Sequence, residues 1–172
     1  MKCNLCPRSC NIDRSLSRGY CGMASELRVA KAYLHKFEEP SVSGTRGSGT
    51  VFFTGCNMRC CFCQNYSVSQ EDLGKTISIP RLAEIFRELE AQGAHNINLV
   101  TAGHYVPQVI TALDGVKHKL EIPVAYNSGG YELVSTLKML EGYIDIYLPD
   151  FKYYDNELAA KYSSAQIGRA HV

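Results

Sequence analysis

Residues 51–65 read Val51-Phe-Phe-Thr-Gly-Cys-Asn-Met-Arg-Cys-Cys-Phe-Cys-Gln-Asn65, a short apolar run followed by a cysteine-rich loop. The apolar run is typical of a buried strand. Cys56, Cys60 and Cys63 then follow with the spacing C-x3-C-x2-C. Iron-sulfur clusters are normally held by four cysteine thiolates, so three closely spaced ones suit a four-iron cluster whose fourth iron is open. An open metal position is typical of catalytic sites.

The same three cysteines allow two other interpretations. They could form a structural zinc site completed by a distant histidine or a fourth cysteine, or they could be buried thiols. Their position directly after a strand favours a cluster. Cys61 adjoins a ligand and need not share the cluster, so we expect it to be a packed or free thiol.

A second group of cysteines precedes this loop. Cys3, Cys6, Cys10 and Cys21 have the spacing C-x2-C-x3-C-x10-C. Four thiolates in a short segment can close a tetrahedral zinc site or hold a second iron-sulfur cluster, and the spacing leaves that choice open. Because the segment is too short for a core of its own, metal binding would supply its folding energy.

The remainder of the chain divides at a connector rich in glycine and serine, Ser41–Gly49. Residues 1–46 form a Cys-rich metal-binding segment, and a β/α pattern begins at about residue 47. Short apolar runs of the kind that a parallel sheet buries predict four strands. These are Thr50–Thr54, Ile97–Thr101, Ile122–Tyr126 and Ile144–Leu148.

Helical patterns lie between these strands. Apolar residues spaced as on one helix face predict helices at 82–89, 106–113 and 133–140, with Pro80 near the start of the first and Gly93 at its end. Strand and helix therefore alternate, which predicts the α/β class with a parallel sheet or barrel built from βαβ units.

The cysteine loop, with Phe62 before its last cysteine, resembles the cluster motif of the radical SAM superfamily. Cys3–Cys10, Leu34-His-Lys-Phe-Glu-Glu-Pro40, Gly93–Val100 and Leu148–Tyr153 also resemble an uncharacterised branch related to pyruvate formate-lyase activating enzymes. The resemblance covers residues 1 to about 163 and implies a partial parallel (βα) barrel of radical SAM type with an N-terminal Cys-rich segment.

Only four strands of the implied six-stranded barrel fit this chain. We therefore expect a truncated gene fragment in which residues 47–165 are the N-terminal part of the barrel and the fourth strand has an unpaired edge. Residues 166–172 do not resemble the family and are expected to be a non-native tail.

Polar residues follow the later predicted strands, at the end where the active site of such barrels lies. They are His104, Asn127, Ser128, Asp150 and Lys152. The resemblance implies that Cys56, Cys60 and Cys63 hold the cluster and that these polar residues contact the cofactor S-adenosylmethionine. Thr101 to His104 lacks the glutamate with which the family often binds the methionine amino group.

The resemblance also implies a reaction. A [4Fe-4S] cluster would cleave S-adenosylmethionine reductively to a 5′-deoxyadenosyl radical that abstracts hydrogen, with glycyl-radical-enzyme activation as one form of it. A protein substrate and a flavodoxin- or ferredoxin-like reductant would be the partners. The alternative is a non-catalytic iron-sulfur or zinc protein, either an electron carrier or an interaction module. A carrier would need four protein ligands at its cluster, which favours the enzyme.

Composition bounds the remaining classes. The 172 residues are 45% hydrophobic and 20% charged, as in one soluble globular unit. A net charge of +1 without a long Lys/Arg run argues against a nucleic-acid partner. No apolar stretch approaches the roughly 20 residues that a membrane span needs, and the first residues lack a signal-peptide core. We expect a cytoplasmic protein, whose clustered cysteines are metal ligands rather than disulfides.

Overall fold

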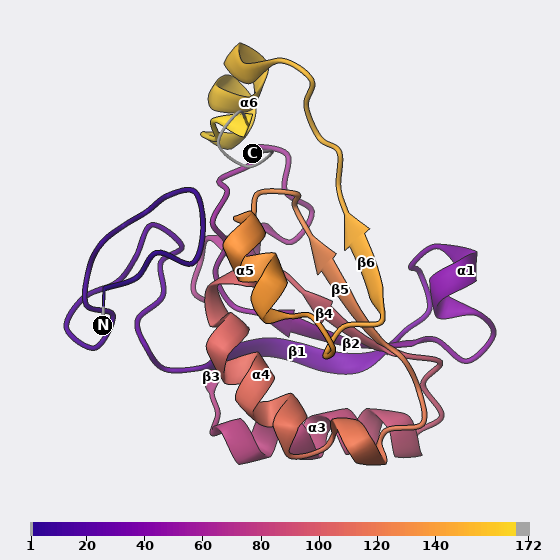
Figure 1. Cartoon of the computed structure of the whole chain (residues 1–172). Coiled ribbons are helices and arrows are strands. Elements are labelled where there is room, and N and C mark those ends of the chain that lie inside the picture. Colours follow the sequence, from indigo (N-terminus) through magenta and orange to yellow (C-terminus); the bar gives the residue numbers. More distant parts are fainter. Residues whose placement is uncertain (1, 168–172) are drawn as a thin grey trace.

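The structure, a computed structural model, describes residues 2–167 and contains one six-stranded sheet with the order β3-β1-β2-β4-β5-β6 (Figure 1). The strands are β1 (Arg28–His35), β2 (Ser48–Phe53), β3 (Lys75–Thr76), β4 (Ile97–Val100), β5 (Val124–Ser128) and β6 (Ile146–Pro149). The helices are α1 (Pro40–Ser43), α2 (Tyr66–Ser69), α3 (Ile79–Ala91), α4 (Val106–Asp114), α5 (Val134–Met139) and α6 (Asn156–Ser163). Short 3-10 helices span Gly103–Tyr105 and Lys117–Lys119.

Strands β2, β4, β5 and β6 are parallel, as the alternation of strand and helix predicts. Their register aligns Thr50 with Asn98, Asn98 with Ala125, and Ala125 with Ile146. These strands coincide with the four predicted ones to within about two residues at each end, the usual scatter of strand boundaries. Among the described residues the sheet stays open and β6 pairs only with β5. The predicted partial βα barrel is confirmed.

Strand β1 was not predicted. It pairs antiparallel with β2, with Leu34 opposite Gly49, although its residues fall in the range assigned to the Cys-rich segment. Its sequence gives a weak strand pattern because alanine and lysine alternate with the larger apolar residues. On β1, Tyr33 stacks on Phe52 of β2, with ring centroids 5.9 Å apart.

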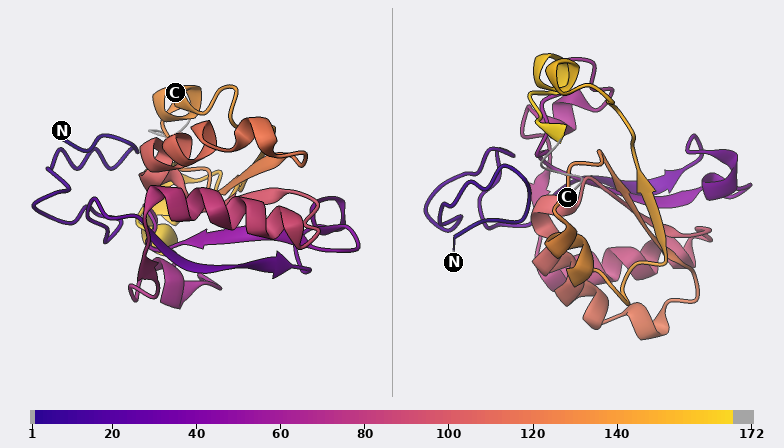
Figure 2. Two further views of the ribbon diagram at one scale, coloured as in Figure 1. Left: turned by 90° about the horizontal axis from the view of Figure 1, so that it is seen from below. Right: turned by 45° about the horizontal axis from the view of Figure 1, so that its top comes forward.

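Helices α3 and α4 pack together on one side of the sheet (Figure 2). The predicted helix at 82–89 is confirmed, because Leu82, Ile85, Phe86 and Leu89 are all buried on α3. The Ser78 hydroxyl accepts a hydrogen bond from the Arg81 amide and caps the first turn. These apolar side chains form the main core together with those of β2, β4 and α4.

The predicted apolar stripe at 133–140 is only partly buried. Leu140 is buried, but Val134 at the start of α5 is 44% exposed, so its assignment to the core is wrong. The short helix instead turns Thr136 inward, and its hydroxyl donates to the carbonyl of Leu5. None of the described helices is long and apolar enough to cross a membrane.

Helix α6 stands beyond the end of the sheet, on the side where the loop after β2 lies (Figure 1). The amides of Arg59 and Cys61 donate to the carbonyls of Ser163 and Tyr162. The end of the described chain therefore rests on the cysteine loop. Of the predicted tail, residues 168–172 lie outside the described residues.

Candidate metal centre

A cavity of about 780 Å³ opens at the carboxyl ends of the parallel strands. This is the end of a βα barrel at which active sites form, and the volume is in the range of small-molecule sites. Polar residues and thiols from the loops after β2, β4, β5 and β6 share it. They include Cys56, Cys60, Cys63, Thr101, Asn127, Ser128, Asp150 and Lys152.

The three cysteines of the predicted cluster line this cavity from one loop. That loop turns away from β2 at Gly55, whose φ of +87° is a conformation that favours glycine. A side chain at Gly55 would meet the carbonyl oxygen of Cys21. Cys61 is exposed and does not line the cavity, which agrees with the expectation that it takes no part in a cluster.

Each of the three sulfurs has a hydrogen-bonding neighbour. The Met58 amide donates to Cys56 Sγ at 3.4 Å, and the Ser163 hydroxyl donates to Cys60 Sγ at 2.8 Å. Cys63 Sγ lies 3.3 Å from the hydroxyl of Ser69. Donors aimed at sulfur tune thiolate ligands in iron-sulfur proteins, so these contacts would favour the thiolate form against the effect of burial.

Burial raises the pKa of the Cys56 thiol to about 12. Burial also raises the pKa of Cys60, while the Ser163 hydroxyl and the Lys152 charge oppose that rise. A bound metal takes the thiolate form, so binding at this loop would release protons. Within residues 2–167 no three metal-ligating side chains stand at metal-binding distance, and the sulfurs must converge to hold one. Three thiols on one loop, open to a cavity, fit a cluster with one free iron.

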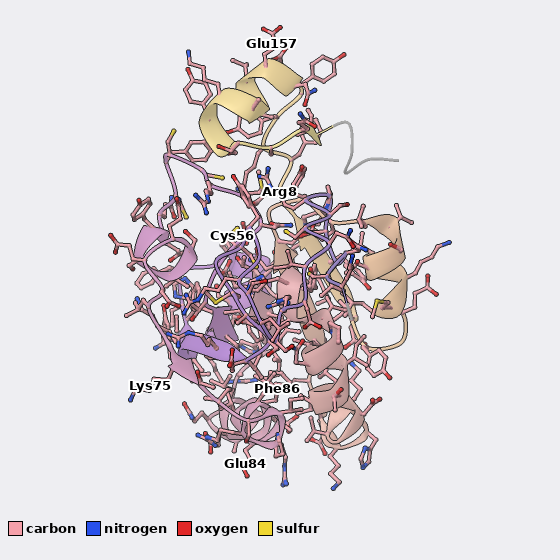
Figure 3. All side chains as sticks on the ribbon, turned by 90° about the vertical axis from the view of Figure 1, so that its left-hand side faces the viewer. Arg8, Cys56, Lys75, Glu84, Phe86 and Glu157 are labelled. Carbon is pink, nitrogen blue, oxygen red and sulfur yellow. The ribbon has the colours of Figure 1, made fainter. Side chains whose placement is uncertain are left out.

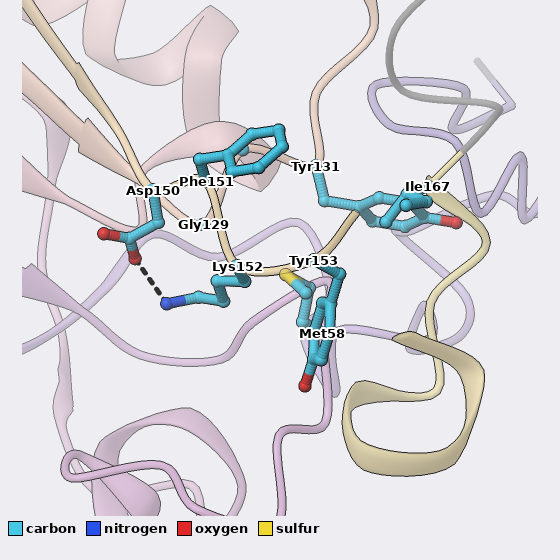
Figure 4. Close-up of a pocket in the computed structure, with 9 residues that line it drawn as sticks. Met58, Gly129, Tyr131, Asp150, Phe151, Lys152, Tyr153 and Ile167 are labelled. Carbon is cyan, nitrogen blue, oxygen red and sulfur yellow. Dashed lines mark hydrogen bonds and ion pairs between the residues drawn. The ribbon is translucent and has the colours of Figure 1, made fainter. Parts of the chain in front are cut away.

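Asp150 and Lys152 follow β6, as predicted, and line the cavity. They form an ion pair, drawn in Figure 4 among the residues of a smaller neighbouring pocket. The Lys152 side chain passes close to Gly129, and the Asp150 backbone lies against Gly130. A smaller pocket lies beside the pair, where Met58 and Tyr153 also form the wall. The Lys152 ammonium also lies close enough to Cys60 for its charge to act on that thiol.

Asn127 and Ser128 stand at the end of β5 and both line the cavity. The carbonyl of Asn127 accepts a hydrogen bond from the Thr101 amide. The Asn127 side chain makes no hydrogen bond to other described residues. The Ser128 hydroxyl donates to the carboxyl of Glu132 at 3.0 Å. Burial raises the pKa of Glu132 to about 7. Sequence reasoning missed Glu132, although it follows the Asn127–Gly130 loop by only two residues.

His104 is buried and does not line the cavity. Its Nε2 donates to the carbonyl of Thr54 at 2.8 Å, and burial lowers its pKa to about 4. Its own carbonyl accepts from the Arg14 guanidinium. Thr101 lines the cavity from this loop instead, with a φ of +60° that is strained for a β-branched residue. A cofactor contact by His104 stays a prediction.

The N-terminal cysteines lie beside the cysteine loop. The Arg8 Nε, between Cys6 and Cys10 in the sequence, donates to the carbonyl of Asn57 at 2.8 Å. Figure 3 labels Arg8 and Cys56 in this region, where the first segment of the chain meets the loop after β2. The two cysteine groups predicted from the sequence are therefore neighbours in space.

Comparisons with known proteins agree with this arrangement. The model of the radical SAM superfamily matches residues 50–169, which include the cysteine loop, most of β2 and all of β4, β5 and β6. An uncharacterised protein, MJ0674 of Methanocaldococcus jannaschii, is 33% identical in an alignment that covers 95% of this chain and 49% of that protein. The chain thus spans about half the length of this curated relative. It belongs to the radical SAM superfamily.

Proposed function

We propose that the chain carries the cluster and cofactor site of an enzyme that uses S-adenosylmethionine for radical chemistry. The observation that supports this most is the cavity, which three thiols of one loop share with polar residues from the ends of the parallel strands. When bound, a [4Fe-4S] cluster would supply the electron that cleaves S-adenosylmethionine to a 5′-deoxyadenosyl radical, which abstracts hydrogen from a substrate.

The chain's own residues would bind and orient the cofactor. Cys56, Cys60 and Cys63 would be the ligands, leaving one iron for the cofactor. The Lys152 ammonium would attract the cofactor carboxylate as a point charge once it exchanges Asp150 for that partner. The Asn127 amide, which has no bond to described residues, would donate to the methionine or ribose group.

Apolar walls would keep water from the reacting atoms. Phe53 and Val100 line the cavity where β2 and β4 end, and Met58 lines it from the cysteine loop. Excluding water strengthens the interactions of charged groups and protects a reactive radical from side reactions.

The wider assignments are also proposals. The relation to pyruvate formate-lyase activating enzymes rests on the resemblance of the motifs, and it would make a glycine of a partner protein the substrate and a flavodoxin- or ferredoxin-like protein the reductant. We propose the same division into a Cys-rich segment, residues 1–46, and part of a barrel, residues 47–165. The activity of the whole protein is a proposal too, since the chain spans 49% of its relative.

An electron carrier or a zinc-stabilised interaction module is the alternative function. A carrier normally holds its cluster with four thiolates. In this loop the fourth sulfur, that of Cys61, is exposed and does not line the cavity. That arrangement supports the enzyme over the carrier.

The test is anaerobic reconstitution with iron and sulfide, followed by EPR of the reduced protein with and without S-adenosylmethionine. We expect a four-iron signal that shifts when the cofactor is added, because the cofactor would bind the open iron. Cys60→Ala should abolish the signal, and the control Cys61→Ala should retain it. An EPR signal that does not shift when the cofactor is added, or one that Cys60→Ala leaves intact, would reject the proposal.

A further inference from the structure

The fold brings the N-terminal cysteines near one another through a loop and a turn, each closed by backbone hydrogen bonds. In the first, the Cys3 amide donates to the carbonyl of Ile12 and the Asn11 amide donates back to the carbonyl of Cys3. The second is closed by the Gly22 amide, which donates to the carbonyl of Gly19. They place Cys3 beside Asn11 and Ile12, and Cys21 near Cys10 at Gly19.

Two of the four sulfurs lie close to Gly19. A β-carbon at this glycine would lie 3.5 Å from Cys21 Sγ and 3.7 Å from Cys10 Sγ. The Tyr20 amide also donates to Cys10 Sγ at 3.4 Å. This bond matches the one that Cys56 Sγ receives in the cluster loop at the same distance. Amide donors to sulfur stabilise the thiolate that a metal requires.

Residues 2–27 contain no helix or strand within the described structure, only the isolated bridge between Lys2 and Asp13. Their buried apolar side chains are Pro7, Met23 and Leu27, of which the last two lie at the end nearest β1. A segment of this kind folds stably when a metal or disulfides cross-link it. Its four cysteines are free thiols, which leaves a metal as the cross-link.

The lack of a core in this segment favours a structural ion over a second cluster, a choice that the spacing alone leaves open. Cys3 with Cys6 and Cys6 with Cys10 both have separations typical of zinc sites. Four protein thiolates also fill a tetrahedral zinc ion completely, whereas the cluster loop supplies three. Within the described residues these four thiols do not stand at metal-binding distance from one another, and neither do the cluster cysteines. Metal binding would therefore draw the sulfurs together.

The segment also braces the cluster loop. The carbonyl of Cys21 lies against Gly55, and the Arg8 guanidinium binds the carbonyl of Asn57. Arg8 stacks between the rings of Tyr20 and Tyr131, 3.8 and 5.0 Å from their centroids. Both neighbours of Cys56 in the sequence therefore contact the N-terminal segment.

We propose that Cys3, Cys6, Cys10 and Cys21 form a closed tetrathiolate zinc site that holds the cluster loop in place. Each thiol releases its proton to solvent as it binds, and no redox step is involved. The site is independent of the cluster, and its role is to fix the backbone on both sides of Cys56.

The test uses the whole chain with Cys56, Cys60 and Cys63 changed to serine, so that the cluster loop binds no metal. Zinc content is measured after dialysis, and cobalt(II) is titrated into the metal-free protein. We expect about one zinc per chain and, with cobalt, the visible absorption of tetrahedral cobalt(II) bound by thiolates. Adding Cys6→Ser and Cys10→Ser should remove both, whereas the matched control Cys61→Ser should change neither.

A variant that replaces one zinc ligand by another distinguishes loss of metal binding from misfolding. In the same background, Cys10→His should retain zinc and weaken the sulfur-to-cobalt charge-transfer band, because one thiolate is lost. The proposal is overturned if the cluster-free chain retains no zinc, if it retains iron with sulfide instead, or if Cys6→Ser with Cys10→Ser leaves the zinc content unchanged. Since this chain lacks the cluster ligands, the outcome does not depend on the radical function.

Discussion

At the scale of single residues, Arg8 joins the two groups of cysteines. Its guanidinium lies over the Tyr20 ring and donates to the carbonyl of Asn57, next to Cys56. A charge held between aromatic rings and a carbonyl gains from cation–π attraction as well as from the hydrogen bond. One side chain therefore fixes the cluster loop against the N-terminal segment.

We predict that Arg8→Ala lowers the free energy of unfolding by about 2 kcal/mol, since it removes a charged hydrogen bond and the stacking. It should also speed the loss of iron from the reconstituted protein to a chelator. Urea unfolding and iron-release kinetics measure the two effects. The control is Arg18→Ala, which removes a more exposed arginine that pairs with Asp72. Equal effects of the two changes would contradict the bracing role of Arg8.

Two buried groups make opposite contributions to pH dependence. The pKa of Glu132 is raised to about 7, so the folded chain keeps a proton there that the unfolded chain releases above its ordinary pKa of 4.5. The pKa of His104 is lowered to about 4, so the folded chain lacks a proton that the unfolded chain binds below 6.5. Stability falls with rising pH through Glu132 and rises with it through His104.

We predict that these slopes largely cancel in the apo protein between pH 5 and 6.5. Glu132→Gln should leave a free energy of unfolding that rises by about 2 kcal/mol from pH 5 to 7, from the histidine alone. His104→Gln should leave one that falls by a similar amount. Urea unfolding at the two pH values measures this, and parallel profiles of the two variants would show that these groups do not carry the dependence.

At the scale of elements, the end of β6 is positioned by a glycine in the preceding loop. Gly130 has a φ of +71°, and a β-carbon there would collide with the carbonyl oxygen of Asp150. The close approach holds Asp150 and Lys152 at the cavity. The β5–α5 loop and the residues after β6 therefore form one unit around the predicted cofactor contacts.

We expect Gly130→Ala to separate the β5–α5 loop from the residues after β6. We predict a loss of more than about 2 kcal/mol in the free energy of unfolding, from backbone strain and the collision together, and weaker binding of S-adenosylmethionine by the reconstituted protein. Gly142→Ala is a matched control, because its φ is +82° and a β-carbon there meets nothing within 4 Å. It should cost only the strain, about 1 kcal/mol, and leave cofactor binding unchanged. Urea unfolding and isothermal titration calorimetry check both, and equal losses would mean that the collision has no effect.

Elements with strong local patterns were predictable from the sequence. The apolar face of α3, with Pro80 near its start and Gly93 after its end, and the apolar runs of the parallel strands follow from residue spacing alone. Strand β1 was not predictable in this way, since its stability comes from pairing with β2 and from the contact of Tyr33 with Phe52. The weak intrinsic preference of such a strand depends on neighbours that are distant in the sequence.

For the candidate site, the sequence predicted residues but not their contacts. The positions of Cys56, Asn127 and Lys152 at one cavity follow from the ends of parallel strands. Local sequence could not predict that His104 turns inward to Thr54, because that bond joins residues 50 positions apart. The role of Glu132 depends likewise on burial that the fold creates.

At the scale of the whole molecule, the sheet has an open edge at β6 among the described residues. Ile146 and Tyr147 on this strand are 37% and 42% exposed. A free edge with apolar side chains is a template for pairing with another chain. We predict concentration-dependent self-association in sedimentation velocity, which Ile146→Lys should reduce. Leu16→Lys, at a residue 86% exposed in the N-terminal segment, should leave it unchanged. A monomer at every concentration would contradict this prediction.

The anchoring of the N-terminal segment also has a consequence for synthesis on the ribosome. The carbonyl of Leu5 receives its bond from Thr136, 131 residues later in the chain, and Arg8 stacks on Tyr131. At the usual 5 to 20 residues per second, roughly 6 to 26 seconds separate the translation of these partners. During that interval the segment that carries the first four thiols lacks these anchoring contacts. These thiols are then most open to oxidation and to capture of the wrong metal, so the metal and redox state of the cell during translation would influence how much of the protein matures.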